Sequence, residues 1–157
     1  MSVVLDHAEA ASLSEGFRSR VHEITDVSRP GYHEVWWQHT VSSSDRFPFS
    51  YYASALRGEG PEADELLVVS VEVMDVQDEA GEHLVVGADI TTGDGVLLAQ
   101  SPTATIDVPS ESTLLTLPDP LARVRDVTRQ VVAATEGLYL WVDNQRPTVE
   151  RALAKIK

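Results

Sequence analysis

Apolar residues recur at helical spacing near the start of the chain. Four of them follow one another at intervals of four, four and three residues, which places them on one face of a helix: Leu13, Phe17, Val21 and Ile24. Gly16 lies inside this pattern and is expected to weaken the helix by about 1 kcal/mol relative to Ala. The pattern predicts an N-terminal helix, which Arg29-Pro30-Gly31 would end.

The middle of the chain alternates between apolar and polar positions, which predicts strands with one buried face. The clearest stripes are Leu67, Val69, Val71 and Val73, and then Leu84, Val86, Ala88 and Ile90. Residues 32–41 and 47–56 are rich in aromatic and β-branched residues, which also favour strands. Pro48 predicts that the second of these strands lies at an edge or begins late. Turn residues at 78–81 and 93–95, followed by apolar segments at 96–100 and 103–108, predict five or six antiparallel strands.

The last third of the chain returns to helical patterns. Asp119-Pro120 is a typical helix start, an N-cap followed by proline in the first turn. The apolar face of this helix would contain Leu121, Val124 and Val131. Gly137 predicts the end of the helix, but residues 138–142 leave two alternatives, because they could form a short strand or continue the helix at the same spacing. Pro147 predicts the start of a last short helix.

This order of elements predicts a single α+β domain over residues 1–157. It would contain an N-terminal helix, a five- to six-stranded antiparallel meander sheet, and C-terminal helices packed on one face. The polar loop 57–62 lies between segments that look like paired strands, so we interpret it as a turn within that domain. Secretion-chaperone-like and START-like domains share this order, but no residue motif here belongs to either, so the order alone indicates no function.

Charge changes this picture by excluding two classes of partner. The chain carries 25 acidic and 12 basic residues, a net charge of −13. This excess argues against nucleic acid and against an anionic membrane surface, because both require basic patches. We expect a cytoplasmic protein, since no apolar run is long enough to span a membrane and residues 1–7 do not resemble a secretion signal. Ten Arg but only two Lys suggest a bacterial origin.

A search for catalytic chemistry finds no signature. The chain has no cysteine, which excludes disulfides and thiolate chemistry, and it has no phosphate loop or nucleophile elbow. His33 and His39 would share a strand face but lie about 20 Å apart, so they cannot hold one metal ion. They remain candidates for acid–base chemistry because histidine titrates near neutral pH. We expect no metal and no cofactor.

Two further groups of residues are candidates for binding. Arg125 and Arg129 lie one helical turn apart and form a candidate anion patch, although they could instead form a solvated face paired with Asp126. Seven of the 10 aromatic residues lie between positions 32 and 52. Trp36 and Trp37 would face opposite sides of a strand, so one ring lies outside if helices cover one side only. The candidate partner surface is Tyr32, Trp36, Trp37, Phe49, Tyr51 and Tyr52.

Three functions remain open from the sequence. The first hypothesis is a non-enzymatic binding module that engages a protein partner, or a second copy of itself, through the aromatic-rich strand pair of residues 32–56. The alternative is a small pocket enzyme or small-molecule carrier, with a cavity lined by Trp37, Phe49 and Tyr51 and a histidine as acid or base. The third is an acidic inhibitor or mimic that captures a basic partner, whose binding would weaken with salt.

Overall fold

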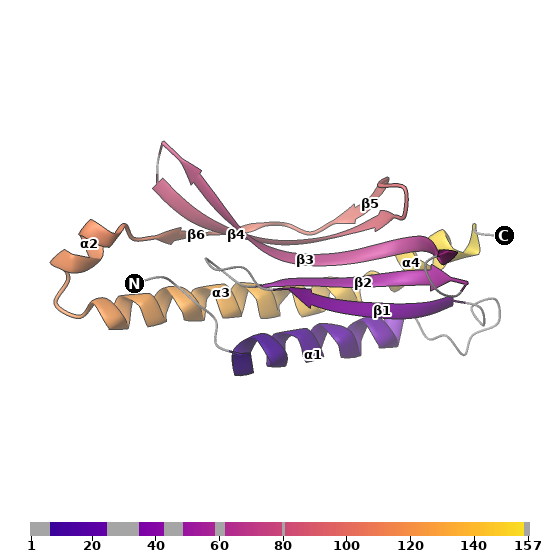
Figure 1. The fold of residues 1–157 in the computed structure, drawn as a ribbon, viewed down its shortest axis with the longest axis horizontal. Coiled ribbons are helices and arrows are strands. Elements are labelled where there is room, and N and C mark those ends of the chain that lie inside the picture. Colours follow the sequence, from indigo (N-terminus) through magenta and orange to yellow (C-terminus); the bar gives the residue numbers. More distant parts are fainter. Residues whose placement is uncertain (1–6, 25–34, 43–48, 59–61, 80, 156–157) are drawn as a thin grey trace.

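The computed structural model describes residues 7–24, 35–42, 49–58, 62–79 and 81–155. Helix α1 (His7–Ile24) precedes six strands: β1 (Val35–Ser42), β2 (Ser50–Arg57), β3 (Asp64–Asp78), β4 (Gly81–Thr92), β5 (Leu97–Gln100) and β6 (Ala104–Val108). The helices α2 (Glu111–Thr116), α3 (Pro120–Asp143) and α4 (Arg146–Ala154) complete the chain. The sheet lies over the two long helices α1 and α3, which confirms the predicted α+β fold (Figure 1).

All strand pairs of the sheet are antiparallel, and β1 to β4 follow one another as a meander. Both β5 and β6 pair with β4, at different positions along it: Ala99 is opposite Ile90, whereas Ala104 is opposite Val86. Ser101 bridges the two short strands. Its backbone N–H donates to the carbonyl of Ala88, and its Oγ accepts from the N–H of Ala88, both at 2.9 Å. The Ser101 side chain therefore replaces part of the backbone hydrogen bonding between strands, at the point where Pro102, which has no N–H, interrupts it.

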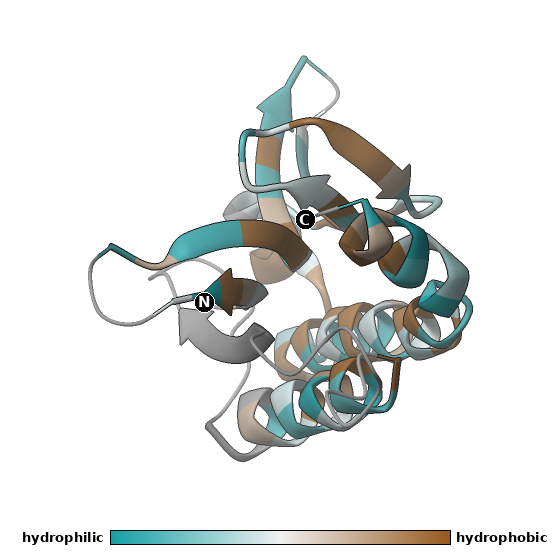
Figure 2. Ribbon diagram, turned by 90° about the vertical axis from the view of Figure 1, so that its right-hand side faces the viewer, coloured by the Kyte–Doolittle hydropathy of each residue, from teal (hydrophilic) through white to brown (hydrophobic). Residues whose placement is uncertain are grey.

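The apolar stripes of β3 and β4 form the helix-facing side of the sheet. All eight residues predicted there are buried, as are the four apolar residues of the α1 stripe. Seen from the end, α1 and α3 run side by side (Figure 2). They join the sheet and α4 in a single core cluster, to which α3 contributes Val127, Val131, Leu138 and Val142. Burial of these stripes is the main driving force for this arrangement.

Helix α3 differs from the prediction at its C-terminal end and at one residue of its apolar face. Its start is as expected, because the carboxylate of Asp119 accepts from the N–H of Ala122 at 3.1 Å. Gly137 does not end the helix. Residues 138–142 continue it, since Leu138 and Val142 extend the buried stripe and their burial outweighs the low helix propensity of one glycine. Leu121 is not a core residue: it is 54% exposed, and the buried positions of α3 begin at Val127.

Other predictions fall at or beyond the limits of the described residues. Strand β2 begins at Ser50 and lies between β1 and β3, so it begins late and is not an edge strand. Pro48 itself and Arg29-Pro30-Gly31 lie outside the described residues. In the part of the chain that the structure describes, no helix is both long enough and apolar enough to cross a membrane.

Candidate ligand-binding groove

The predicted aromatic surface separates into several parts. Tyr32 and His33 lie outside the described residues. Trp36, Trp37 and His39 belong to β1, where the backbone register places them opposite Leu56, Ala55 and Ala53 of β2 respectively. Strand β1 is at one end of the strand order. These three residues therefore occupy a terminal strand of the described sheet.

Phe49 and Tyr51 belong to the core rather than to the predicted surface. Each is 1% exposed, and their ring centroids lie 6.3 Å and 5.7 Å from that of Phe17 in α1. Burial also raises the pKa of the Tyr51 hydroxyl well above its usual range. The sequence contained a signal for this outcome, because residues 49–55 largely alternate between buried apolar and less buried positions, with Ser50 and Ser54 on the second face.

Tyr52 lies on the face of the sheet opposite to Tyr51, within a polar cluster. Its hydroxyl donates to a carboxylate oxygen of Glu72, and this hydrogen bond is the main cause of its raised pKa. The register places Tyr52 opposite Ser70 and Ser70 opposite Asp89. Burial, and then the negative charge of Glu72, raise the pKa of Asp89. The hollow beside these residues measures only about 70 Å³, which is room for water rather than for a substrate.

Arg125 and Arg129 are exposed on α3. The carboxylate of Asp126 accepts instead from Arg123 at 2.7 Å and from Gln130 at 3.0 Å. Neither Arg125 nor Arg129 forms an ion pair with another described residue. The two residues therefore lie one turn apart on α3, as the sequence predicted, but neither pairs with Asp126.

His83, which the sequence did not single out, has a carboxylate on each side. Its Nδ1 lies 2.8 Å from Asp107 of β6, and its Nε2 lies 3.2 Å from Asp78 at the end of β3. The hydrogen bond to Asp107 is the largest cause of its raised pKa, followed by that to Asp78. Since both ring nitrogens face carboxylates, the protonated ring is favoured, and such a ring is an ion-pair partner rather than a general base. No group of three His, Asp or Glu side chains in the described ranges could hold a metal ion.

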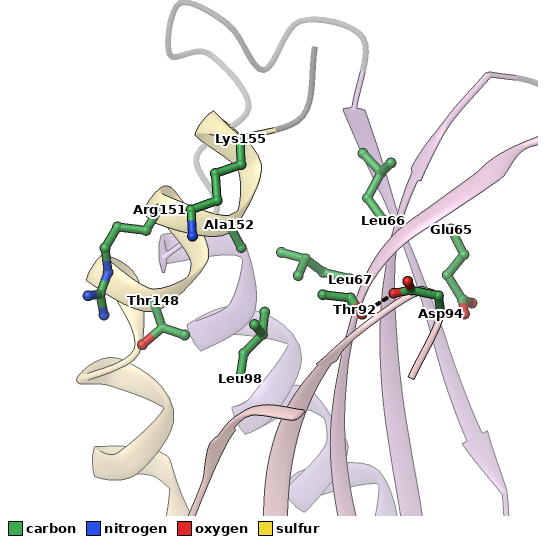
Figure 3. A pocket seen from close by; sticks show the side chains of 11 residues that line it. Glu65, Leu66, Leu67, Thr92, Asp94, Leu98, Thr148, Arg151, Ala152 and Lys155 are labelled. Carbon is green, nitrogen blue, oxygen red and sulfur yellow. Dashed lines mark hydrogen bonds between the residues drawn. The ribbon is translucent and has the colours of Figure 1, made fainter. Parts of the chain in front are cut away.

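A cavity with a mainly apolar lining lies between the end of the sheet and α4. It has a volume of about 650 Å³ and forms where three separate segments meet: the start of β3, the β4–β5 turn with β5, and α4. We call it the β5–α4 groove. Leu67, Leu98 and Ala152 converge on it from these three segments (Figure 3). Its remaining lining residues are Glu65, Leu66, Thr92, Gly93, Asp94, Thr148, Arg151 and Lys155.

The β4–β5 turn that shapes one wall of the groove is fixed by its backbone. The N–H of Gly93 donates to the carbonyl of Leu66 at 3.1 Å, and the N–H of Thr92 donates to the carbonyl of Val96 at 2.8 Å. A Cβ atom at Gly93 would lie 1.7 Å from the carbonyl oxygen of Glu65, so only glycine fits there. Gly95 has a φ of +92°, which also favours glycine. The sequence predicted this turn from 93–95, but it gave no indication of the groove beside it.

Three consecutive apolar residues are exposed next to the groove. Val96 is 56%, Leu97 is 52% and Leu98 is 37% exposed, and the strand that contains the last two ends the strand order of the sheet. Runs of exposed apolar residues at an edge are a liability in a protein that binds nothing, because they promote association. Their position at the groove therefore makes this region the best-supported binding site in the described structure.

Comparison with models of protein families, with the curated proteins and with the solved structures finds no match for this chain. The function must therefore be inferred from the geometry of the chain itself.

Proposed function

We propose that the protein is a non-enzymatic binding module whose ligand occupies the β5–α4 groove. The observation that carries this proposal is the apolar-lined cavity of about 650 Å³ beside the exposed residues of β5. Small-molecule sites commonly measure about 300–1,000 Å³ and combine an apolar lining with a few polar groups. This proposal retains binding as the function and moves the site away from the aromatic strand pair.

The lining of the groove supports binding rather than catalysis. It contains no histidine. The hydroxyl of Thr92 donates to the carboxylate of Asp94, so these two polar groups of the groove are hydrogen-bonded to each other. A general acid–base site needs a titratable group within hydrogen-bond reach of the reacting atoms and activated by a neighbour. Thr92, Asp94 and Thr148 are instead suited to orienting a ligand.

A neutral apolar dye tests this proposal. We expect Nile red to bind the intact chain at one molecule per protein, with an increase in its fluorescence. Leu98→Asp should weaken binding roughly tenfold or more, because it places a charge on the wall of an apolar site. Leu121→Asp is the matched control, since Leu121 is exposed at the start of α3 and does not line the groove. Unchanged binding by Leu98→Asp, with its circular dichroism intact, would contradict the proposal.

Strand β1 supports a second candidate, self-association. It pairs with β2 alone within the described sheet, and it contains Trp36 and Trp37. A terminal strand presents backbone groups to which a second strand can bind. Native mass spectrometry should then show a homodimer, and Trp36→Ala or Trp37→Ala should dissociate it. A monomer at micromolar concentration, or a dimer that both variants leave unchanged, would argue against this candidate.

The acidic-inhibitor hypothesis, the cytoplasmic location and the bacterial origin stay predictions from the sequence, because no contact among the described residues bears on them.

A further inference from the structure

Basic residues gather on the helical wall of the groove, in contrast to the rest of the chain. Residues 146–157 contain four bases, including both lysines, and one acid, Glu150, which leaves eight bases against 24 acids elsewhere. This segment includes α4 and its C-cap residue Lys155, and the groove is lined by Lys155 together with Thr148, Arg151 and Ala152 of α4. Arg151 and Lys155 therefore place positive charge next to an apolar cavity, although the net charge of the chain is −13.

The two basic residues of the groove are available to a ligand. Glu150, the acid of this segment, pairs with Arg146 at 3.8 Å. Neither Arg151 nor Lys155 forms an ion pair with another described residue. Arg151 donates from Nε to the carbonyl of Pro147 at 3.3 Å, which leaves its terminal nitrogens as donors. Lys155, the C-cap residue of α4, follows Arg151 by one helical turn, so the two charges can act on the same anionic group. In Figure 3 the Arg151 guanidinium points away from Leu67 and Leu98, so this group would lie at the outer edge of the groove.

The acidic residues of the groove lie on the opposite wall. Glu65 and Asp94 come from the sheet side, and in Figure 3 Glu65 points away from α4. The carboxylate of Asp94 accepts from the hydroxyl of Thr92. An anionic group is therefore favoured at the helical wall and disfavoured at the sheet wall, which gives a charged ligand one preferred orientation.

We infer that the ligand of the β5–α4 groove is a small anionic amphiphile, an apolar chain with a carboxylate at one end. Its chain would contact Leu67, Leu98 and Ala152, and its carboxylate would lie beside Lys155 and Arg151. This inference rests on the proposed function. A small molecule fits the geometry because elements on three sides bound the cavity, and its volume is that of a small-molecule site.

Three probes with the same apolar chain test the sign of the ligand's charge. Dodecanoate, dodecanol and dodecyltrimethylammonium would be titrated into the full chain by calorimetry, below the concentrations at which they aggregate. We expect dodecanoate to bind about fivefold more tightly than dodecanol, which corresponds to an exposed ion pair, and the ammonium to bind most weakly. Equal affinity for carboxylate and alcohol, or tightest binding of the ammonium, would overturn the inference.

Charge-removing variants test the residues. Lys155→Gln with Arg151→Gln should reduce the affinity for dodecanoate to that for dodecanol and leave the alcohol unaffected. Arg125→Gln with Arg129→Gln removes the same charge from α3, outside the groove, and should change neither affinity. Loss of carboxylate binding in both double variants would overturn the inference, because it would show an effect of net charge alone. If none of the three probes binds, or if Leu98→Asp affects none of them, the proposed function itself fails.

Discussion

The packing of α1 against α3 depends on Gly16, because the lack of a side chain there leaves room for the ring of Tyr139. The Tyr139 ring crosses α1 at Gly16, where a Cβ atom would lie 2.3 Å from the Tyr139 hydroxyl oxygen. The ring is held in place by three contacts. It packs edge-on against Phe17 at 4.7 Å, Arg20 lies 4.4 Å over its face, and its hydroxyl donates to the carbonyl of Leu13 at 3.3 Å. The glycine thus makes room for a ring that cannot easily move.

Gly16→Ala is therefore expected to destabilise the protein by about 1–3 kcal/mol, because overpacking outweighs the gain in helix propensity. Urea unfolding followed by circular dichroism measures this change. Gly137→Ala in α3 is the matched control, since a Cβ atom there would meet nothing within 4 Å. It should stabilise the protein by about 0.5–1 kcal/mol. If both variants were stabilised equally, the close approach of Tyr139 to Gly16 would be refuted.

The sequence predicted the core residues around Gly16 but not the role of the glycine. Phe17 and Val21 were predicted from spacing, which is a local property of the chain. Gly16 could be interpreted only as a cost to the helix, because its partner Tyr139 lies in the C-terminal part of the chain. A residue whose identity depends on a distant element is not predictable from local pattern.

At the scale of elements, Gly93 connects the β4–β5 turn to β3 and so determines the wall of the groove. Gly93→Ala must displace the Glu65 carbonyl or the turn, and we expect it to cost at least about 2 kcal/mol. It should also weaken Nile red binding, since Leu98 follows the turn. Gly95→Asn is the control: its Cβ would meet nothing within 4 Å, and Asn tolerates a positive φ. Equal stability of the two variants would contradict this account of the turn.

The end of the β3–β4 hairpin is joined to β6 by the contact between His83 and Asp107. The pKa of His83 is raised above its ordinary value of 6.5, so the folded state binds its proton more tightly than the unfolded state. The protonated His83 therefore contributes its full stabilisation of the folded state below pH 6.5. This contribution is lost as the pH rises through the pKa of His83 in the folded state. We expect the stability difference between the protein and His83→Gln to shrink over that range, measured by urea unfolding at a series of pH values.

Asp107→Asn tests whether the carboxylate of Asp107 causes the raised pKa of His83. Because the hydrogen bond to Asp107 is the largest cause of the raised pKa, the variant should lower the pKa of His83 toward 6.5, as measured by NMR titration of the ring. A pKa that stays where it is in the intact protein would show that Asp78 alone accounts for the shift.

The elements of the fold were predicted from the sequence more fully than the site was. Helix α1 and strands β3 and β4 each follow from an uninterrupted periodic pattern. The choice between strand and helix at residues 138–142 needed tertiary contacts, because a short apolar run fits both. The groove could not be predicted, since Leu67, Leu98 and Ala152 become neighbours only when three separate segments meet. Aromatic richness was a misleading signal at Phe49 and Tyr51, which the sheet buries.

At the scale of the whole molecule, the surplus of acidic residues should limit stability. With 25 acids against 12 bases, at least half of the carboxylates have no base of their own, and their mutual repulsion is stronger in the compact state than in the unfolded chain. Raising NaCl from about 10 mM to about 150 mM shortens the screening length from roughly 30 Å to roughly 8 Å. Such screening should stabilise the folded protein by about 1 kcal/mol, or ~3 °C in Tm for a chain of this size.

Two features of this experiment separate repulsion from other effects of salt. NaCl is preferable to sulfate, which also strengthens the burial of apolar surface. The same scan near pH 4.6, where the net charge of the chain approaches zero, should show little dependence on NaCl, because the repulsion being screened is then gone. A Tm that falls as NaCl rises at neutral pH would mean that attractive pairs, such as Arg123 with Asp126, outweigh the repulsion. In that case local ion pairs, rather than long-range repulsion, would dominate the electrostatic contribution to stability.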